Sequence, residues 1–244
     1  FKNEQKYCAF SWIYTGYPAS TYNGVSVEEV RERSGVNLAK KDLTEGLKAD
    51  LVAGIPDSGT AYAVGYAQEA KIPLRRVLIK YTPGYGRSFL PPSKEERDQI
   101  AQKKLLPIPA LIAGKKIVIC DDSIVRGTQL RNQVIDRLWE YGAAEIHLRI
   151  GCPPLLFACP YFLSTRTTTE LAARRAIDEV HLSSKPTSAF TKESPSYRRM
   201  VKRIAQSLGV TSLVYQSIDE MVGAISLPAE SLCLYCWQGG KDKK

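Results

Sequence analysis

The sequence predicts an α/β domain with a doubly wound, mostly parallel sheet. Short apolar runs alternate along the chain with longer helical patterns, and the connections between them are short. Such alternation is typical of strand–helix–strand units, in which neighbouring strands run parallel. The clearest strand is predicted for residues 115–120, which are largely apolar and β-branched and are followed by Asp121 and Asp122. At 244 residues, the chain is long enough for one large domain of this class with a well-buried core.

The first helix is predicted for residues 26–41, because Ser26 suits the N-cap and Glu29 follows three residues later, as in a capping box. Residues 50–55 form a short apolar run typical of a buried strand, and the turn PDSGT after them opens a helix over residues 59–70. Further strands are expected at 74–80, 115–120 and 145–151, and further helices at 93–104, 128–141, 168–180 and 195–208.

The composition limits the partners that the chain is expected to bind. The formal net charge is +9, but the basic residues are mostly scattered and form no stripe with interleaved aromatics, so we expect no nucleic-acid partner. No apolar run approaches the roughly 20 residues that span a membrane, and no signal peptide opens the chain. We therefore expect a cytoplasmic protein without a membrane partner. Because the chain begins at Phe1 and not at Met, we interpret it as a fragment or a processed product.

The residues after the clearest strand favour a phosphate-binding site. The stretch SIVRGT leads into a helix, and its backbone N–H groups, together with the hydroxyls of Ser123 and Thr128, suit an anion. Gly127 allows the backbone to approach a ligand closely. Asp121 and Asp122 would repel a phosphate alone, but they suit ribose hydroxyls or a Mg²⁺ ion that holds pyrophosphate. A bare pair of aspartates after a strand would indicate only a helix cap, whereas the whole string favours the ligand site.

The string IVICDDSIVRGTQ, residues 117–129, resembles the signature of type I phosphoribosyltransferases. Its form DDSIVRGT resembles that of the amidophosphoribosyltransferase family, which opens de novo purine synthesis. Three further segments are similar to that family, namely GIPDSGTAYAVGYAQEAKIP, IKYTPGYGRSFLPP and GCPPLLFACPYF with the TRTTTEL that follows. The resemblance covers about residues 8–236 and implies a type I phosphoribosyltransferase fold.

The resemblance also implies roles for individual residues. In the family the acidic pair binds the ribose of phosphoribosyl pyrophosphate (PRPP) and its Mg²⁺, which makes Asp121 and Asp122 the catalytic candidates and adds Ser58 to the metal site. The other PRPP-binding candidates are Asp57 and Gly59 in the PDSG turn, Lys80 and Arg87 at the loop that closes over PRPP, and Ser123, Ile124, Val125, Arg126, Gly127 and Thr128 around the 5-phosphate.

The implied activity is attack of ammonia on C1 of PRPP to give 5-phosphoribosylamine. The family takes this ammonia from glutamine through an N-terminal glutaminase domain, which this chain lacks, so the expected nitrogen source is free ammonia or a separate glutaminase domain. The family commonly forms homo-oligomers, and we expect the same here. The chemistry needs no strong general base, which suits a chain with two histidines.

The six cysteines are expected to be thiols, because nothing marks the chain as secreted. Cys233 and Cys236 form a C-x-x-C pair, a spacing that suits a metal centre, either iron–sulfur or zinc. The resemblance implies a [4Fe–4S] cluster on Cys8, Cys159, Cys233 and Cys236, with a Cys₄ zinc site or no metal as the alternatives. The remaining two, Cys120 and Cys152, lie in or beside apolar strands and are expected to be buried packing residues.

We expect three segments, residues 1–25 packing on the core, residues 26–227 forming the phosphoribosyltransferase domain, and residues 228–244 forming a tail with the C-x-x-C pair. The chain departs from the family in its closing loop, where KYTPGYGRSF stands in place of a pattern like KNRYVGRTF. This departure favours one alternative, a non-catalytic module with the same fold that senses PRPP or purine nucleotides. A salvage transferase acting on a free base is a weaker alternative, because the loop has the purine-pathway form.

Overall fold

The computed structural model describes residues 6–80, 105–161, 165, 167–191 and 193–240. Its centre is a four-stranded parallel sheet with the strand order β4, β7, β8, β9. These strands comprise β4 (Leu51–Gly54), β7 (Lys116–Asp121), β8 (Glu145–Ile150) and β9 (Ser212–Tyr215). The predicted α/β class with a parallel sheet is thereby confirmed. The predicted helix at 93–104 and the candidate Arg87 lie outside the described residues.

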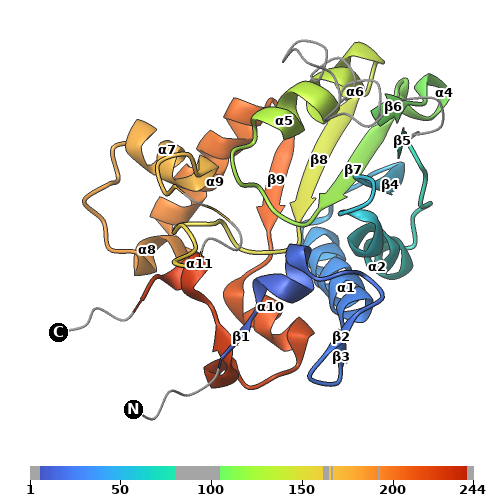
Figure 1. The fold of residues 1–244 in the computed structure, drawn as a ribbon. Coiled ribbons are helices and arrows are strands. Elements are labelled where there is room, and N and C mark those ends of the chain that lie inside the picture. Colours follow the sequence, from blue (N-terminus) through green and yellow to red (C-terminus); the bar gives the residue numbers. More distant parts are fainter. Residues whose placement is uncertain (1–5, 81–104, 162–164, 166, 192, 241–244) are drawn as a thin grey trace, which may run out of the picture.

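Helices cover both faces of the sheet (Figure 1). On one face α1 (Val27–Glu45) and α2 (Thr60–Ala70) pack in a cluster that takes Val118 and Cys120 from β7. Ile117 and Ile119, which alternate with these two residues along β7, point to the other face and join the larger core. That face is covered by the π-helix η2 (Arg131–Ile135), α6 (Asp136–Glu140) and α9 (Pro195–Leu208). The alternation follows from the pleat, which turns successive side chains of a strand to opposite faces.

Short elements complete the chain. In order, these are β1 (Tyr7–Cys8), the π-helix η1 (Ser11–Thr15), β2 (Thr21–Tyr22), β3 (Val25–Ser26), β5 (Leu78–Lys80), β6 (Leu105–Pro107), α4 (Pro109–Ile112), α5 (Thr128–Leu130), α7 (Ala172–Glu179), α8 (Ser188–Thr191), α10 (Ile218–Ile225), the 3₁₀ helix η3 (Ala229–Ser231), β10 (Leu232–Cys233) and α11 (Tyr235–Gln238). Parallel pairing of β1 with β10 joins the N-terminal and C-terminal segments. Where the three predicted segments begin and end stays a prediction.

Local signals account for several element boundaries. The Ser26 side chain accepts a hydrogen bond of 3.4 Å from the Glu29 backbone, so the predicted N-cap of α1 is confirmed. Gly46, in the left-handed conformation with φ of 74°, ends the same helix. The expected strand at 74–80 is shorter than predicted. Leu74 forms an isolated parallel bridge with Val52, and the strand there is β5 alone, which pairs antiparallel with β6. Neither β9 nor α10 was expected from the sequence.

Two glycines let α1 and α2 cross closely. A Cβ atom on Gly35 would lie 2.0 Å from the Tyr62 carbonyl oxygen, and one on Gly65 would lie 1.9 Å from the Glu32 carbonyl oxygen. Both distances are far below van der Waals contact, so only glycine fits at either position. The close crossing matters for function because α2 begins directly after the turn that carries Ser58.

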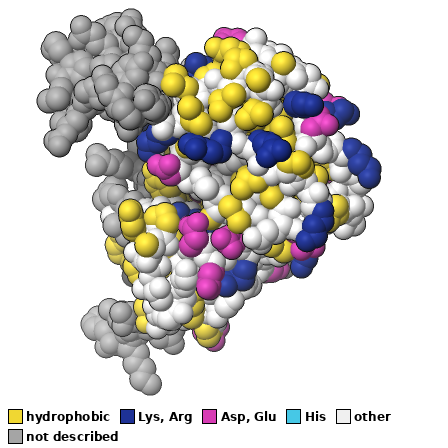
Figure 2. Space-filling model, turned by 90° about the vertical axis from the view of Figure 1, so that its right-hand side faces the viewer, with side chains coloured by type: hydrophobic (Ala, Val, Ile, Leu, Met, Phe, Trp, Pro, Cys, Tyr) yellow, Lys and Arg dark blue, Asp and Glu magenta, His cyan; other side chains and the backbone are white. Residues whose placement is uncertain are grey.

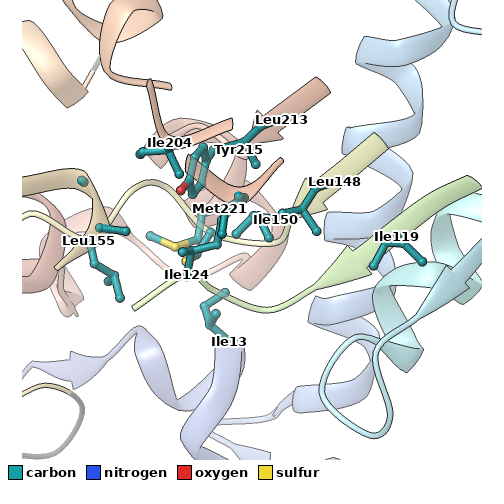
Figure 3. Packing of buried hydrophobic residues seen from close by; sticks show 14 of the residues in the cluster. Ile13, Ile119, Ile124, Leu148, Ile150, Leu155, Ile204, Leu213, Tyr215 and Met221 are labelled. Atoms are coloured by element: carbon teal, nitrogen blue, oxygen red, sulfur yellow. The ribbon is translucent and has the colours of Figure 1, made fainter. Parts of the chain in front are cut away.

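The larger core continues beyond the carboxyl ends of the strands. Figure 3 shows Ile124 and Leu155, from the segments after β7 and β8, gathered with Ile13, Ile150 and Met221. All five side chains are nearly inaccessible to solvent, with exposed fractions between 0% and 4%. The segments that follow the strands are therefore anchored by apolar packing, which holds the polar residues beside them in place.

One face of the molecule agrees with the expected scattered charge distribution. Figure 2 shows the side of the molecule where α2 and α4 lie in Figure 1, and its basic side chains are spread among acidic and apolar ones. Among the described residues, none of the helices combines the length and the apolar character needed to cross a membrane.

Candidate active site

The acidic pair lies where β7 ends, and the hydroxyls of two serines contact it. Ser58, from the turn after β4, donates a hydrogen bond of 2.7 Å to Asp121 Oδ1. The Asp122 backbone N–H donates to the same oxygen at 3.0 Å, and the Ser123 hydroxyl donates to Asp122 Oδ1. Two neighbouring parallel strands thus contribute to one polar cluster at the carboxyl edge of the sheet, the position where such sheets bind ligands.

The turn after β4 is pressed against the end of β7. The Ile55 N–H donates to the Cys120 carbonyl at 3.0 Å, which extends the β4–β7 ladder to the start of the turn. A Cβ atom on Gly59 would lie 2.0 Å from that same Cys120 oxygen, so a side chain there would force the turn away. Asp57, in the same turn, pairs with Lys80 of β5 at 2.8 Å. The structure therefore brings four of the sequence candidates, Asp57, Ser58, Gly59 and Lys80, to one side of the acidic pair.

Burial makes both carboxyl groups of the pair harder to ionise. The pKa of Asp121 is raised well above its usual value, first by burial and then by the neighbouring charge of Asp122. Burial also raises the pKa of Asp122 to about 6, although hydrogen bonds from Ser123 and Ser58 and the charge of Arg31 act in the opposite direction. Two buried acids side by side are unfavourable in the absence of a cation, so the cluster is suited to a ligand that supplies positive charge or hydrogen-bond donors.

The loop between β7 and α5 is fixed at both ends. Ile124 is buried in the core, and the Val125 carbonyl accepts a hydrogen bond of 2.7 Å from the Ala172 N–H. Gly127 adopts φ of 79°, a left-handed conformation that favours glycine, immediately before the helical residue Thr128. The loop backbone is thus shaped before any ligand binds, as an anion-binding loop requires.

Arg126 stands apart from the other loop candidates. Its guanidinium pairs with the exposed carboxylate of Glu170, and its backbone carbonyl accepts a hydrogen bond from Arg175. The side chain is 64% exposed. Any contribution of Arg126 to anion binding therefore comes from its backbone, since its charge is shared with Glu170.

Sequence reasoning missed a buried arginine beneath the site. Arg31, on α1, is 4% exposed and donates to the backbone carbonyls of Trp12, Tyr14 and Gly16 at 3.0, 3.2 and 3.0 Å. It therefore fastens the η1 segment to the core and places a positive charge near Asp122, whose pKa it lowers. The sequence could have indicated that Arg31 is buried. It lies four residues after the apolar Val27 and therefore on the same face of the helix, which packs on the core.

We expect Arg31→Gln to lower the free energy of unfolding by about 3 kcal/mol, because two buried carbonyls and a partly buried one would lose a charged donor. Urea unfolding followed by circular dichroism measures the change. Arg76→Gln, at an exposed position, is the matched control and should stay within about 0.5 kcal/mol of the parent chain. Equal stability of the two variants would mean that Arg31 does not hold the η1 segment.

The four cysteines of the expected cluster lie in segments that meet. Cys8 and Cys233 are direct partners in the β1–β10 pairing. The Cys236 carbonyl accepts hydrogen bonds from the Leu156 and Phe157 N–H groups, and Phe157 lies two residues before Cys159. Over the residues that the structure describes, however, no three His, Cys, Asp or Glu side chains are placed to share a metal ion. None of the six cysteines forms a disulfide, and Cys120 and Cys152 are fully buried as expected.

The chain is similar to known proteins over nearly its whole length. It is 37% identical over 232 residues to the amidophosphoribosyltransferase of Methanocaldococcus jannaschii and 36% identical over 234 residues to that of Mycobacterium leprae. Among solved structures it matches the glutamine PRPP amidotransferase of Bacillus subtilis, complexed with ADP and GMP, with a TM-score of 0.75 at 31% identity over 98% of this chain. Over this length the chain is similar in sequence and fold to amidophosphoribosyltransferases. No protein-family model matches it.

The similarity covers only part of those amidophosphoribosyltransferases. The aligned regions take in 95% and 96% of this chain but 43% and 38% of the two curated relatives, and 47% of the B. subtilis chain. Within the shared part, the segments that resemble the family in sequence supply the polar cluster, namely the turn with Ser58 and the loop with Asp121, Asp122 and Ser123. The family resemblance of the string after β7 therefore agrees with the geometry at the carboxyl edge of the sheet.

Proposed function

We propose that this chain is the phosphoribosyl-transferring part of an amidophosphoribosyltransferase. It would transfer an amino group, as ammonia that normally comes from glutamine, to C1 of PRPP and give 5-phosphoribosylamine for purine synthesis. The observation that carries the proposal is the hydrogen-bonded cluster of the half-buried Ser58 and Asp121 with the buried Asp122, set beside a preformed loop at the carboxyl edge of a parallel sheet. Homology to amidophosphoribosyltransferases over nearly the whole chain supports it.

The donor set of the cluster fits Mg²⁺. Hard oxygen ligands from Ser58, Asp121 and Asp122 are the type that this ion takes, and the raised pKa values of the two acids indicate that a cation would relieve an unfavourable pair of buried charges. A bound Mg²⁺ would neutralise charge on the pyrophosphate leaving group. Ribose hydroxyls would donate to the two aspartates, and the backbone N–H groups of the 123–128 loop would hold the 5-phosphate.

The transfer itself breaks the bond between C1 and the pyrophosphate oxygen and forms a bond between C1 and the ammonia nitrogen. Lys80, near the turn through its pair with Asp57, and Arg87 would supply positive charge to the departing pyrophosphate. Ammonia attacks as a neutral nucleophile, so the product loses its proton to solvent and no protein base is required. His147 suits this picture, because its ring nitrogens lie 2.9 Å from Ser212 and Glu145, on the sheet and away from the acidic pair.

The competing proposal is a module that binds PRPP or purine nucleotides without turnover. The sequence of the closing loop departs from the family pattern and favours this module, because closure of the loop over PRPP is the step that precedes turnover. Retention of Ser58, Asp121 and Asp122 as one hydrogen-bonded cluster favours the enzyme, since a sensor has no need of a complete metal site.

Calorimetric titration of PRPP with and without Mg²⁺ tests whether the cluster is the ligand site. We expect binding to tighten at least about tenfold with Mg²⁺ and to lose that gain in Ser58→Ala, because the serine hydroxyl belongs to the proposed metal site. Ser188→Ala, in the remote helix α8, is the matched control. Equal affinity with and without the ion would place PRPP elsewhere on the chain.

We further propose that Cys8, Cys159, Cys233 and Cys236 hold a [4Fe–4S] cluster. The β1–β10 pairing and the hydrogen bonds of the Cys236 carbonyl bring the four segments together, and four thiols are a donor set that suits iron–sulfur or zinc. The described side chains do not converge on one point, so cluster assembly would draw the C-x-x-C turn toward Cys159. Its role would be to tie the chain ends to the core.

Cys233→Ser is expected to abolish visible absorbance in protein that is purified without oxygen and to lower the melting temperature. Absorbance spectra, iron and zinc analysis, and thermal melts measure the result. Cys120→Ala, which changes a buried cysteine on β7, should leave the spectrum unchanged. Zinc without iron in the parent chain would indicate a Cys₄ zinc site instead of the cluster. A colourless parent chain without metal would exclude both sites.

The remaining proposals concern partners and place. We propose that the nitrogen comes from ammonia or from a glutaminase domain, that the chain forms a homo-oligomer, and that it works in the cytoplasm. Commonly known features of the family support the first two, and the lack of a membrane-crossing helix among the described residues is compatible with the third.

A further inference from the structure

A large groove lies far from the acidic pair along the free edge of the sheet. Its volume is about 680 Å³, and its floor is formed by residues 211–215, which include all of β9. The carboxyl-terminal half of α1 forms one wall and α9 forms the other, and neither Asp121 nor Asp122 borders it. The site proposed above therefore does not account for this groove.

The floor of the groove is an open strand edge. β9 pairs with β8 on one side, and within the described part of the chain no strand pairs with its other side. The Thr211 N–H donates to the Ile146 carbonyl at 2.8 Å, so alternate residues turn their N–H and C=O groups toward β8. The intervening residues, Ser212 and Val214, turn theirs into the groove. Such an edge is a template for one more strand.

The walls favour an acidic occupant. Five lining residues are basic and three are acidic, namely Lys40, Lys41, Arg149, Arg198 and Lys202 against Glu45, Glu193 and Glu220. Arg149 is buried and pairs with Asp42 at 2.6 Å, Lys41 pairs with Glu220 at 3.0 Å, and Arg198 pairs with Glu193 at 3.6 Å. Lys40 on α1 and Lys202 on α9 are exposed, and neither forms an ion pair with a described residue. The acidic lining residue without such a pair is Glu45, so the unpaired charges of the groove sum to one positive charge. One unpaired cation thus stands on each wall above the strand edge.

The shape and chemistry favour a peptide over a nucleotide. A nucleotide site of this size normally offers an aromatic or apolar slot for the base, together with groups that grip phosphate. The aromatic residues that border the groove are Tyr197 and Tyr215, and Tyr215 is 3% exposed while burial raises the pKa of both hydroxyls. Tyr215 is buried and Tyr197 is partly buried against the core, whereas the floor offers main-chain donors and acceptors.

We propose that this groove binds an extended acidic peptide segment, which adds to β9 as a strand while its carboxylates pair with Lys40 and Lys202. Main-chain hydrogen bonds to Ser212 and Val214 supply affinity. Because α1 and α9 cover opposite faces of the sheet, the two cations select acidic side chains on opposite faces of the added strand, such as those of two adjacent residues. The occupant belongs to a partner protein with an exposed acidic strand. The inference is independent of the proposed transferase activity, because it uses none of the residues of that site.

The test uses a fluorescein-labelled six-residue peptide with two adjacent glutamates at its centre and threonine at the other positions, so that carboxylates point to both walls. Fluorescence anisotropy measures its binding to the 244-residue chain. Two altered peptides probe the two contacts, one with glutamine in place of glutamate and one with N-methyl groups on alternate backbone nitrogens. Each is expected to bind at least about tenfold more weakly. Because these changes are in the peptide, the result does not depend on how a protein variant folds.

On the protein side, the double variant Lys40→Glu with Lys202→Glu should also weaken binding at least about tenfold. Arg76→Glu, an exposed charge reversal beyond the opposite edge of the sheet, should leave it unchanged. Undiminished binding of the N-methylated peptide, or no binding below about 1 mM, would overturn the proposal. Displacement of the peptide by inorganic pyrophosphate would also overturn it, because the groove would then be a small-anion site.

Discussion

Asp122→Asn is expected to reduce ammonia-dependent formation of phosphoribosylamine at least about 1,000-fold. Asp122 is 5% exposed and its carboxylate accepts the Ser123 hydroxyl, so it is held in place before the ligand arrives. Replacing one carboxylate oxygen by an amide removes a negative charge and turns an acceptor into a donor. Both changes act against a metal ion and against ribose hydroxyls that must donate. Initial rates of the variant and the parent chain measure the loss.

The same variant should lose little stability, which separates a ligand-binding role from a packing role. Burial raises the pKa of Asp122, so the folded chain without Mg²⁺ is destabilised when this carboxyl ionises at neutral pH. The neutral amide removes that cost, and we expect a free energy of unfolding at least equal to that of the parent. Asp219→Asn, at an exposed position on α10, is the matched control and should keep full turnover. Parent-like turnover in Asp122→Asn would remove Asp122 from the site.

Gly59→Ala is expected to lower the free energy of unfolding by about 3 kcal/mol and to weaken Mg²⁺-dependent PRPP binding together with it. The backbone angles of Gly59, φ of −87° and ψ of −3°, suit any residue, so the expected effect is purely steric. The added carbon would lie 2.0 Å from the Cys120 carbonyl oxygen and 2.6 Å from the Ile55 nitrogen. Both contacts are to backbone, which cannot swing aside, so the turn must move and take Ser58 with it.

Gly223→Ala is the control for this substitution. Gly223 lies inside α10, and a Cβ atom there has no atom within 4 Å. Alanine is favoured over glycine in a helix interior, so this variant should gain up to about 1 kcal/mol. Chemical denaturation of both variants gives the comparison. A Gly59→Ala chain as stable as the parent would mean that the turn after β4 is not pressed against β7.

The part of the site that the sequence could predict lies within one continuous stretch. A β-branched strand, two aspartates and a loop with Ser123 and Gly127 carry their structure in adjacent residues, so β7 and the loop were identified directly. The contact between Ser58 and Asp121 joins residues that are far apart in the chain. That contact was expected only through the family resemblance, because no local pattern encodes it.

Other features were beyond local patterns for identifiable reasons. β9 has four residues, SLVY, whose burial alternates. Its half-buried positions hold Ser212 and the apolar Val214, so the sequence itself shows no alternation of apolar and polar residues. β5 is extended only where β6 pairs with it, and β6 lies far along the chain. By contrast, α10 was missed although Ser217 and Glu220 form a complete capping box at its start. That signal was available in the sequence.

The most direct test of the central claim is the rate of pyrophosphate release from PRPP and Mg²⁺ as the ammonium concentration is raised at mildly alkaline pH, on protein purified without oxygen. The account predicts release that increases with free ammonia, is matched by phosphoribosylamine formation, and disappears in Asp122→Asn. Tight PRPP binding with no ammonia-dependent release would contradict the transferase and favour the sensing module.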